Sequence, residues 1–268
     1  MTRVDWSGEF RALRCRAPGT SGVLRVTLAP GTAANRMTAA LHRDLAALWP
    51  AVAGDPAVRA VLLRSDDEDF CGGTDPALIA HAVAADATAR AALLEESRAI
   101  VLGAVDCAVP VVGAVRGLAV GAALGVALLA DACVVGPSTR LADGHARVGV
   151  VAGDHAVLIW PLLCGLGRAR RILLLGDVVD GVEAERIGLV SDCVADGDVE
   201  ARAEALATRL AALPPEATRW TKRALGHWLR LGLPAFDASL AYEMLSYALP
   251  GPAEAARQLT EGRSEDLV

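Results

Sequence analysis

A histidine and a carboxylate that lie close together can transfer protons near neutral pH, and one stretch of the chain carries both. His145 is followed nine residues later by Asp154, in the segment Gly153-Asp154-His155. A histidine that a carboxylate orients is a competent general base, because its ordinary pKa is about 6.5. We therefore predict that Asp154 accepts a hydrogen bond from one ring nitrogen of His145. The other nitrogen would then face substrate or water.

Asp154 also has a second candidate role. Aspartate is a favoured helix N-cap, and a helix is expected over residues 156–163, directly after it. Capping and orienting are compatible. Of the other histidines, His42 is predicted to be a half-buried helix residue and His155 to support the pair, whereas His81 and His227 are expected at the surface.

Composition and charge limit the class of partner. The 268 residues are 53% hydrophobic and 22% charged, which is typical of a globular protein with a substantial core. The net charge is −6 and no basic run occurs, which argues against a nucleic-acid partner. The longest uncharged apolar run, residues 117–130, is too short to span a bilayer, so we expect no membrane partner.

The cysteines and the N-terminal residues indicate the cellular compartment in which the protein is expected. The six cysteines are scattered and no two have metal-ligand spacing, which favours a reduced compartment and predicts no metal site. Residues 1–10 include Asp5 and Glu9 and lack the apolar segment of a signal peptide. We expect a soluble cytoplasmic protein.

Strand–turn–helix units alternate along most of the chain. Strands are expected at residues 23–28, 58–63, 110–115 and 132–135, and helices at 38–49, 87–105 and 121–129. This alternation predicts an α/β fold. Beyond about residue 197 only helical patterns occur, broken at Pro214-Pro215, Pro234 and Pro250. We therefore predict two parts, an α/β core over residues 1–197 and a helical region over residues 198–268.

Four segments carry a family resemblance by their order and spacing. They are residues 58–64 with Phe-Cys-Gly-Gly-Thr-Asp at 70–75, residues 109–121, Ala-Glu-Arg-Ile-Gly-Leu-Val at 184–190, and Thr-Lys-Arg-Ala-Leu at 221–225. Together they resemble the crotonase (enoyl-CoA hydratase/isomerase) superfamily, from about Val23 to about Glu261. The resemblance implies a ββα spiral core and an acyl-CoA or related carbonyl substrate, with coenzyme A only as part of that substrate.

The resemblance also implies an oligomer. Members of the superfamily associate as trimers, often paired into hexamers, through the helical C-terminal region. In this chain that region carries Leu240, Met244, Leu245 and Leu249, which we expect to form an apolar stripe in need of a cover.

In this superfamily two backbone N–H groups bind the thioester oxygen and stabilise an enolate. By resemblance the two donors of this oxyanion hole are Gly72 and Ala122, where small residues permit a close approach. Ala122 begins a helix, so its N–H group is free and the helix dipole favours negative charge. The resemblance extends to substrate-binding positions around these donors, at Cys71, Gly73, Asp75, Gly121 and Gly125.

The chain departs from the hydratase pattern at the two glutamates that normally hold and deprotonate water. Their positions fall on Gly125 and His145. We expect Gly125 to open space beside the thioester. The segment that contains His145 and Asp154 resembles a branch that includes 6-oxocamphor hydrolase, in which a His–Asp pair activates water to cleave a β-diketone.

Two further residues match functional positions of that hydrolase, His42 and Glu243, and we include both as catalytic candidates. Another of its histidines falls on Ala122, and its tryptophan falls near Met37. Three functions stay open at this point. They are an enoyl-CoA hydratase or isomerase that works through His145, a carbon–carbon hydrolase of a β-diketone, and a non-catalytic subunit with the same fold.

Overall fold

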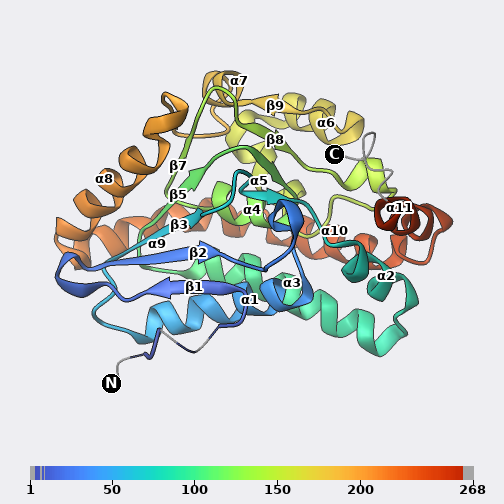
Figure 1. The fold of residues 1–268 in the computed structure, drawn as a ribbon, viewed down its shortest axis with the longest axis horizontal. Coiled ribbons are helices and arrows are strands. Elements are labelled where there is room, and N and C mark those ends of the chain that lie inside the picture. Colours follow the sequence, from blue (N-terminus) through green and yellow to red (C-terminus); the bar gives the residue numbers. More distant parts are fainter. Residues whose placement is uncertain (1–3, 7, 9, 262–268) are drawn as a thin grey trace.

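Two β-sheets form the middle of the structure, a computed structural model that describes residues 4–6, 8 and 10–261 (Figure 1). The larger sheet has the strand order β1-β2-β3-β5-β7-β10, and the smaller has the order β4-β6-β8-β9. The strands are β1 Leu13–Arg16, β2 Val23–Leu28, β3 Ala60–Ser65, β4 Cys71–Gly72, β5 Val111–Val115, β6 Leu118–Val120, β7 Ala132–Val135, β8 Arg140–Ala142, β9 Val179–Asp180 and β10 Asp192–Cys193.

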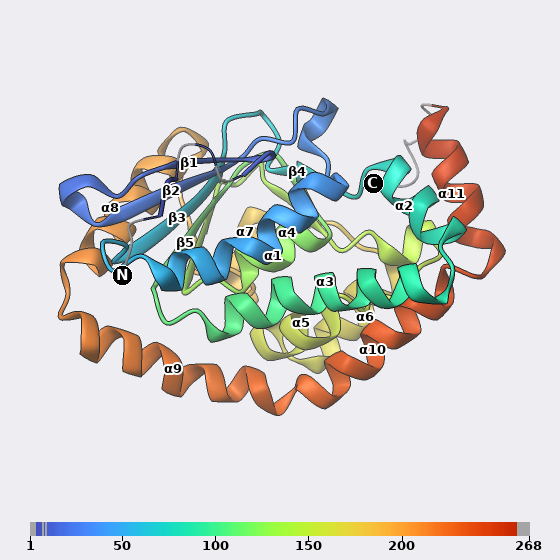
Figure 2. The same cartoon turned by 90° about the horizontal axis from the view of Figure 1, so that it is seen from below.

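Helices surround these sheets, and the last three run along the outside of the molecule (Figure 2). The helices are α1 Ala39–Gly54, α2 Pro76–Ala84, α3 Ala87–Asp106, α4 Ala122–Leu128, α5 Ala156–Cys164, α6 Leu166–Leu175, α7 Gly181–Arg186, α8 Val199–Ala212, α9 Pro215–Leu231, α10 Leu233–Ser246 and α11 Pro250–Thr260. A short 3-10 helix, η3, covers His145–Val148.

The chain winds as a spiral that adds one strand to each sheet per turn. β3 continues into β4, β5 into β6, and β7 into β8, and a helix follows before the next turn. Within the larger sheet β2, β3, β5, β7 and β10 pair in parallel, and only β1 is antiparallel. In the smaller sheet β4, β6 and β8 pair in parallel. The predicted ββα spiral is therefore confirmed.

Local signals placed the longer elements well. The strands predicted at residues 23–28 and 132–135 have those bounds in the structure. Thr38 caps α1, accepting a hydrogen bond from the Leu41 N–H at 3.2 Å. The helix runs to Gly54, beyond the predicted end at residue 49, and includes Pro50.

The packing of α8 joins the helical region to the core. Val199, Ala203, Ala207 and Ala211 are buried on one face of α8, against side chains of β2, β3, β5 and β7. The described strands end at Cys193, close to the predicted boundary at residue 197. The larger sheet nevertheless needs α8 as its cover. The boundary therefore separates the part of the chain that contains strands from the part that is helical, but both parts share the core.

The apolar surface differs from the predicted stripe. Leu240 and Met244 are buried, whereas Leu245 and Leu249 are exposed, so the four residues do not form one outward face. The exposed large apolar side chains of α9 are instead Trp220, Leu225, Trp228 and Leu231. Among the described helices, none combines the length and apolar character needed to cross a membrane.

Candidate active site

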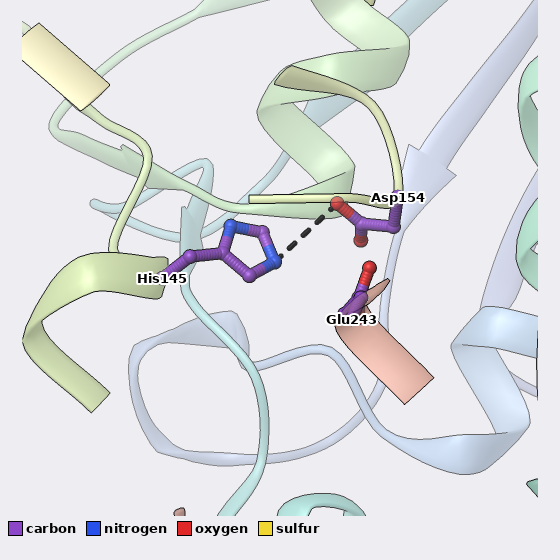
Figure 3. A group of neighbouring side chains, drawn as sticks. All are labelled: His145, Asp154 and Glu243. Carbon is purple, nitrogen blue, oxygen red and sulfur yellow. Dashed lines mark ion pairs between the residues drawn. The ribbon is translucent and has the colours of Figure 1, made fainter. Parts of the chain in front are cut away.

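The imidazole of His145 lies between two carboxylates. His145 begins η3, and its Nδ1 is 3.0 Å from Oδ2 of Asp143. Its Nε2 is 3.4 Å from Oδ1 of Asp154 (Figure 3). The side chains of His145 and Asp154 are 11% and 12% exposed, and that of Asp143 is 1% exposed. The pair predicted from sequence is thus brought together, but a second carboxylate completes it.

Asp143 is the residue that the sequence analysis missed. The prediction that only one ring nitrogen of His145 faces a carboxylate is wrong. Asp143 lies two residues before the histidine, and Gly144 between them has φ 84°, a left-handed conformation that lets the two side chains meet. The sequence did contain a signal for this contact, because Asp143 and His145 are separated only by a glycine.

His155 joins the same two carboxylates from the other side. Its Nδ1 hydrogen-bonds Oδ1 of Asp154, and its Nε2 is 3.6 Å from Oδ1 of Asp143. Two aspartates and two histidines therefore alternate around a closed, largely buried ring. Asp154 does not cap α5, because His155 is at the cap position. The carboxylate of Asp154 instead contacts the imidazoles of His145 and His155. The supporting role predicted for His155 agrees with this geometry.

Gly125 has a different role from the one expected. A Cβ atom at Gly125 would lie 2.6 Å from two ring carbons of His155. The predicted space beside the thioester is therefore absent at this described residue, because the His155 ring fills it. Glycine at residue 125 permits the ring of two histidines and two aspartates.

Glu243 approaches this ring from α10. One of its oxygens, Oε1, accepts a hydrogen bond from the Tyr247 hydroxyl at 3.2 Å. The other, Oε2, is buried and has no hydrogen-bond partner among the described residues. Figure 3 shows the Glu243 carboxyl group near that of Asp154. The sequence pointed to Glu243 through the resemblance, whereas Tyr247 carried no signal.

A metal ion would find three donor atoms here. One ligand atom each from His145, Asp154 and Glu243 lie within 4.8 Å of one another. The predicted absence of a metal stays a prediction, and the chemistry proposed below uses the side chains alone.

Burial and mutual attraction set the charges of the cluster. Burial disfavours the imidazolium form of His145, but Asp143 and Asp154 outweigh it and hold the His145 pKa well above its ordinary value. Burial likewise opposes ionisation of the two aspartates, yet the histidines outweigh it and lower the pKa of both Asp143 and Asp154. Burial, reinforced by the charge of Asp154, raises the pKa of Glu243 well above its ordinary value. The surroundings therefore favour the charged form of His145 and the neutral form of Glu243.

The predicted oxyanion donors lie beside this cluster. Gly72 ends β4, which pairs with β6, and Ala122 is the first residue of α4, so its N–H group lacks an acceptor within the helix. Gly121 before it has φ 68°. A Cβ atom at Gly72 would lie 2.9 Å from the Cβ and carbonyl oxygen of Ala34, so the turn requires glycine. The predicted roles of Gly72 and Ala122 stay predictions, in positions that suit them.

Two adjoining cavities meet at His145. The outer cavity is lined by Gly72, one of the two predicted oxyanion donors, and by Arg36, Gly73, Gly121 and Asp143 among others. The inner cavity is lined by Ala122, Asp154 and Glu243 together with apolar side chains. Three residues line both cavities, namely Thr74, His145 and Tyr247. This arrangement suits a carbonyl held at the junction with its acyl group in the inner cavity.

The remaining predicted positions divide between the cavities and the supporting structure. Gly73 and Gly121 line the outer cavity as expected. Cys71 is fully buried in the core, so its side chain does not serve as a substrate contact. The same burial raises the pKa of its thiol to about 11. Asp75 caps α2, accepting a hydrogen bond from the Ala77 N–H at 2.8 Å.

His42 lies in the inner cavity, on the wall formed by α1 and α3. It is 7% exposed, and its Nδ1 hydrogen-bonds Oε1 of Glu96. Its Nε2 is 3.3 Å from the hydroxyl of Ser97. His42 was predicted to be half-buried, but it is buried and faces the site. Glu96 and Ser97 had no sequence signal, because a polar pair in the middle of a helix usually faces solvent.

Comparison with known proteins agrees with the fold. Residues 19–248 match the family model of enoyl-CoA hydratase/isomerase. The probable enoyl-CoA hydratase EchA14 of Mycobacterium tuberculosis is 33% identical over 193 residues, 71% of this chain and 73% of that protein. An enoyl-CoA hydratase/isomerase structure from Mycobacterium paratuberculosis has a TM-score of 0.88 and 32% identity, covering 93% of this chain and 99% of that one. The chain belongs to the enoyl-CoA hydratase/isomerase family, as the sequence motifs predicted.

A more distant solved structure shares the fold. The β-diketone hydrolase of the cyanobacterium Anabaena, bound to (S)-3-oxocyclohexyl acetic acid, has a TM-score of 0.84 and 23% identity. It covers 92% of this chain and 98% of its own chain. At that identity the likeness concerns the fold alone.

Proposed function

We propose that the protein is an enzyme that binds an acyl-CoA thioester with its carbonyl oxygen between the N–H groups of Gly72 and Ala122. His145 then performs the acid–base chemistry of an enoyl-CoA hydratase or isomerase in place of the usual glutamate. The observation that carries the proposal is the position of His145. It is held between Asp143 and Asp154 at the junction of the outer and inner cavities.

For hydration of an enoyl thioester the side chains have distinct tasks. Neutral His145 keeps a proton on Nδ1, which hydrogen-bonds Asp143, and its Nε2, 3.4 Å from Asp154, accepts a proton from water while the water oxygen bonds to the β-carbon of the substrate. The electron pair of the double bond moves toward the thioester oxygen, where the two N–H groups stabilise the enolate. Glu243, whose pKa burial raises, then donates a proton to the α-carbon from its neutral form. The proton left on His145 returns to Glu243 through solvent or directly.

A second function uses the same groups on a different substrate. In a β-diketone, water activated by His145 attacks one carbonyl, the adjoining carbon–carbon bond breaks, and an enolate leaves. Two observations favour keeping this alternative. By the resemblance, Gly125 and His145 fall at the positions of the two usual glutamates, and a β-diketone hydrolase has the same fold.

A non-catalytic subunit is the third candidate. Loss of both glutamates favours it, but the ring of Asp143, His145, Asp154 and His155 argues against it. Buried titratable groups are costly to hold together, so decay of an active site would not be expected to leave a complete set of them.

A substrate panel tests these functions against each other. The measurement is kcat/KM for the wild-type protein on enoyl-CoA thioesters of increasing length and on cyclic β-diketones, with a calorimetric titration of coenzyme A alongside. Turnover of the thioesters supports the hydratase or isomerase proposal. Turnover of diketones alone, without coenzyme A binding, supports the hydrolase, and no turnover of either class supports the non-catalytic subunit.

A further inference from the structure

The inner cavity has a polar wall that the proposed chemistry does not use. His42 of α1 lies between two consecutive residues of α3, with Nδ1 on the carboxylate of Glu96 and Nε2 3.3 Å from the Ser97 hydroxyl. His42 and Ser97 are 7% and 6% exposed, and both line the inner cavity. The same lining contains the apolar side chains of Met37, Leu78, Ala82, Leu93 and Met244, together with Thr74 and the polar residues described above. The His42–Ser97 pair thus adds a hydroxyl and an imidazole from α1 and α3 to this lining.

The fold alone does not need this pair. A serine inside a helix ordinarily returns its hydrogen bond to a carbonyl of the preceding turn, or faces solvent. Ser97 instead reaches another helix and leaves part of its hydrogen-bonding capacity toward the cavity, since a hydroxyl has one donor and two acceptor sites. Glu96, whose side chain is 26% exposed, fixes the imidazole so that Nε2 faces Ser97.

The other polar side chains of the inner cavity already have partners or tasks. His145 and Asp154 contact one another, and Glu243 accepts a hydrogen bond from Tyr247. Ser97 and His42, together with the hydroxyl of Thr74, are therefore the polar groups of this lining that are left to contact the part of the ligand beyond the reacting carbonyl. Ser97 already hydrogen-bonds His42, and an oxygen atom of the ligand would use its remaining donor or acceptor capacity, which a purely hydrocarbon chain would not.

We propose, building on the function above, that the acyl group of the substrate carries an oxygen substituent, a hydroxyl or a keto group, which hydrogen-bonds Ser97 as positioned by His42 and Glu96. When His42 is neutral, Ser97 donates its hydrogen to Nε2 and accepts one from a ligand hydroxyl. When His42 is charged, Nε2 donates to Ser97, and the serine donates its own hydrogen to a ligand carbonyl. Both arrangements place an oxygen atom of the ligand at the same wall.

Binding of unreactive ligands tests this without relying on turnover. The probes are a short saturated acyl-CoA and its analogues that carry a hydroxyl or a keto group at successive carbons near the end of the chain. Isothermal titration gives the Kd of each for the wild-type protein. We expect one oxygenated analogue to bind about tenfold or more tightly than the plain chain, because a site built for hydrogen bonding discriminates against ligands that lack the group.

Variants of Ser97 separate recognition from packing. Ser97→Ala should bring the preferred analogue to about the affinity of the plain acyl-CoA, whereas Ser97→Thr keeps a hydroxyl and should retain most of the preference. Circular dichroism and the Tm of each variant establish that it is folded. The preferred analogue identifies the ligand as a hydroxyl or a keto compound.

Two outcomes would overturn the inference. The first is equal affinity of the wild type for plain and oxygenated acyl-CoA. The second is a preference that survives Ser97→Ala. Either result leaves the role of His145 untouched. If no thioester binds, the proposed acyl-CoA function fails instead. The inference about Ser97 is then tested by comparing the affinity of the wild type for a cyclic monoketone with its affinity for the matching diketone. Equal affinity for those two would overturn it.

Discussion

At the scale of single residues, the site depends on how three carboxyl groups and two imidazoles share protons. The histidines lower the pKa of Asp143 and Asp154, and the two aspartates in turn raise the pKa of His145. Glu243 is the carboxyl group that burial keeps neutral. Environments that push titratable groups apart in this way separate the acid from the base. In this site we assign proton donation to Glu243, and proton acceptance to the neutral form of His145 that increases as the pH rises toward its raised pKa.

The raised pKa of His145 predicts the pH dependence of the reaction. An imidazole accepts a proton only when neutral, so kcat/KM should be low below the His145 pKa and rise as the pH increases through it. Because that pKa lies above the ordinary value, the rise should occur above about pH 6.5. Asp143→Asn removes one charge that favours the imidazolium and should move the rise to lower pH.

The pH–rate profile of kcat/KM for the two proteins makes this measurement. Asp67→Asn, at an exposed carboxylate, is the matched control and should leave the profile of the wild type unchanged. A rise at the same pH in Asp143→Asn and in the wild type would contradict the assignment of that limb to His145.

Gly125 makes a separate prediction about stability. Its Cβ position is 2.6 Å from the buried ring of His155, so Gly125→Ala forces that ring or α4 to move. We expect destabilisation of about 1–3 kcal/mol from overpacking, measured by chemical denaturation. In Gly167→Ala, the control in α6, the new Cβ has no neighbour within 4 Å and should be neutral or slightly stabilising. Equal stability of the two variants would show that Gly125 does not make room for His155.

At the scale of elements, the turn after β4 and the start of α4 place two N–H groups beside the acid–base cluster. Ala122→Val adds two methyl groups next to the N–H of the first residue of α4 and should crowd the thioester. Loss of one oxyanion donor typically costs about 10²–10³ in rate, so we expect kcat/KM to fall toward that range while the Tm changes little.

Ala122→Gly is the matched variant, since it keeps the N–H group and adds no bulk. It should retain most of the activity, and the comparison of kcat/KM with the Val variant isolates the effect of crowding. If Ala122→Val turned over substrate at the wild-type rate, the assignment of residue 122 to the oxyanion hole would be wrong.

The elements also show what the sequence could predict and why. Strands 23–28 and 132–135 follow from local patterns, so they were predicted closely. β4 and β9 have two residues each, too few for a pattern to show. In the site, Asp154 and Glu243 were predicted through the resemblance to known enzymes. Asp143 and Ser97 were not predicted, because their roles depend on a left-handed Gly144 and on the contact of α1 with α3.

At the scale of the whole molecule, α9 presents an apolar face that a monomer leaves in water. Trp220, Trp228 and Leu231 are 72%, 67% and 74% exposed. Exposed apolar patches of this kind usually mark an interface. We expect the protein to associate through its C-terminal helices as a trimer or a hexamer, and Trp228→Glu to shift it toward smaller species. Multi-angle light scattering at micromolar concentration measures both, and a monomeric wild type would contradict the expectation.

The central claim is that His145 is the acid–base residue, and its replacement tests that claim most directly. The measurement is kcat/KM of His145→Ala and His145→Gln on the best substrate of the panel, with His81→Ala at an exposed histidine as the control. We expect a loss of about 10²–10⁴-fold in both His145 variants, a smaller loss in Asp154→Asn, and none in His81→Ala. Circular dichroism and Tm should stay near those of the wild type. Folded His145 variants with full activity would contradict the account.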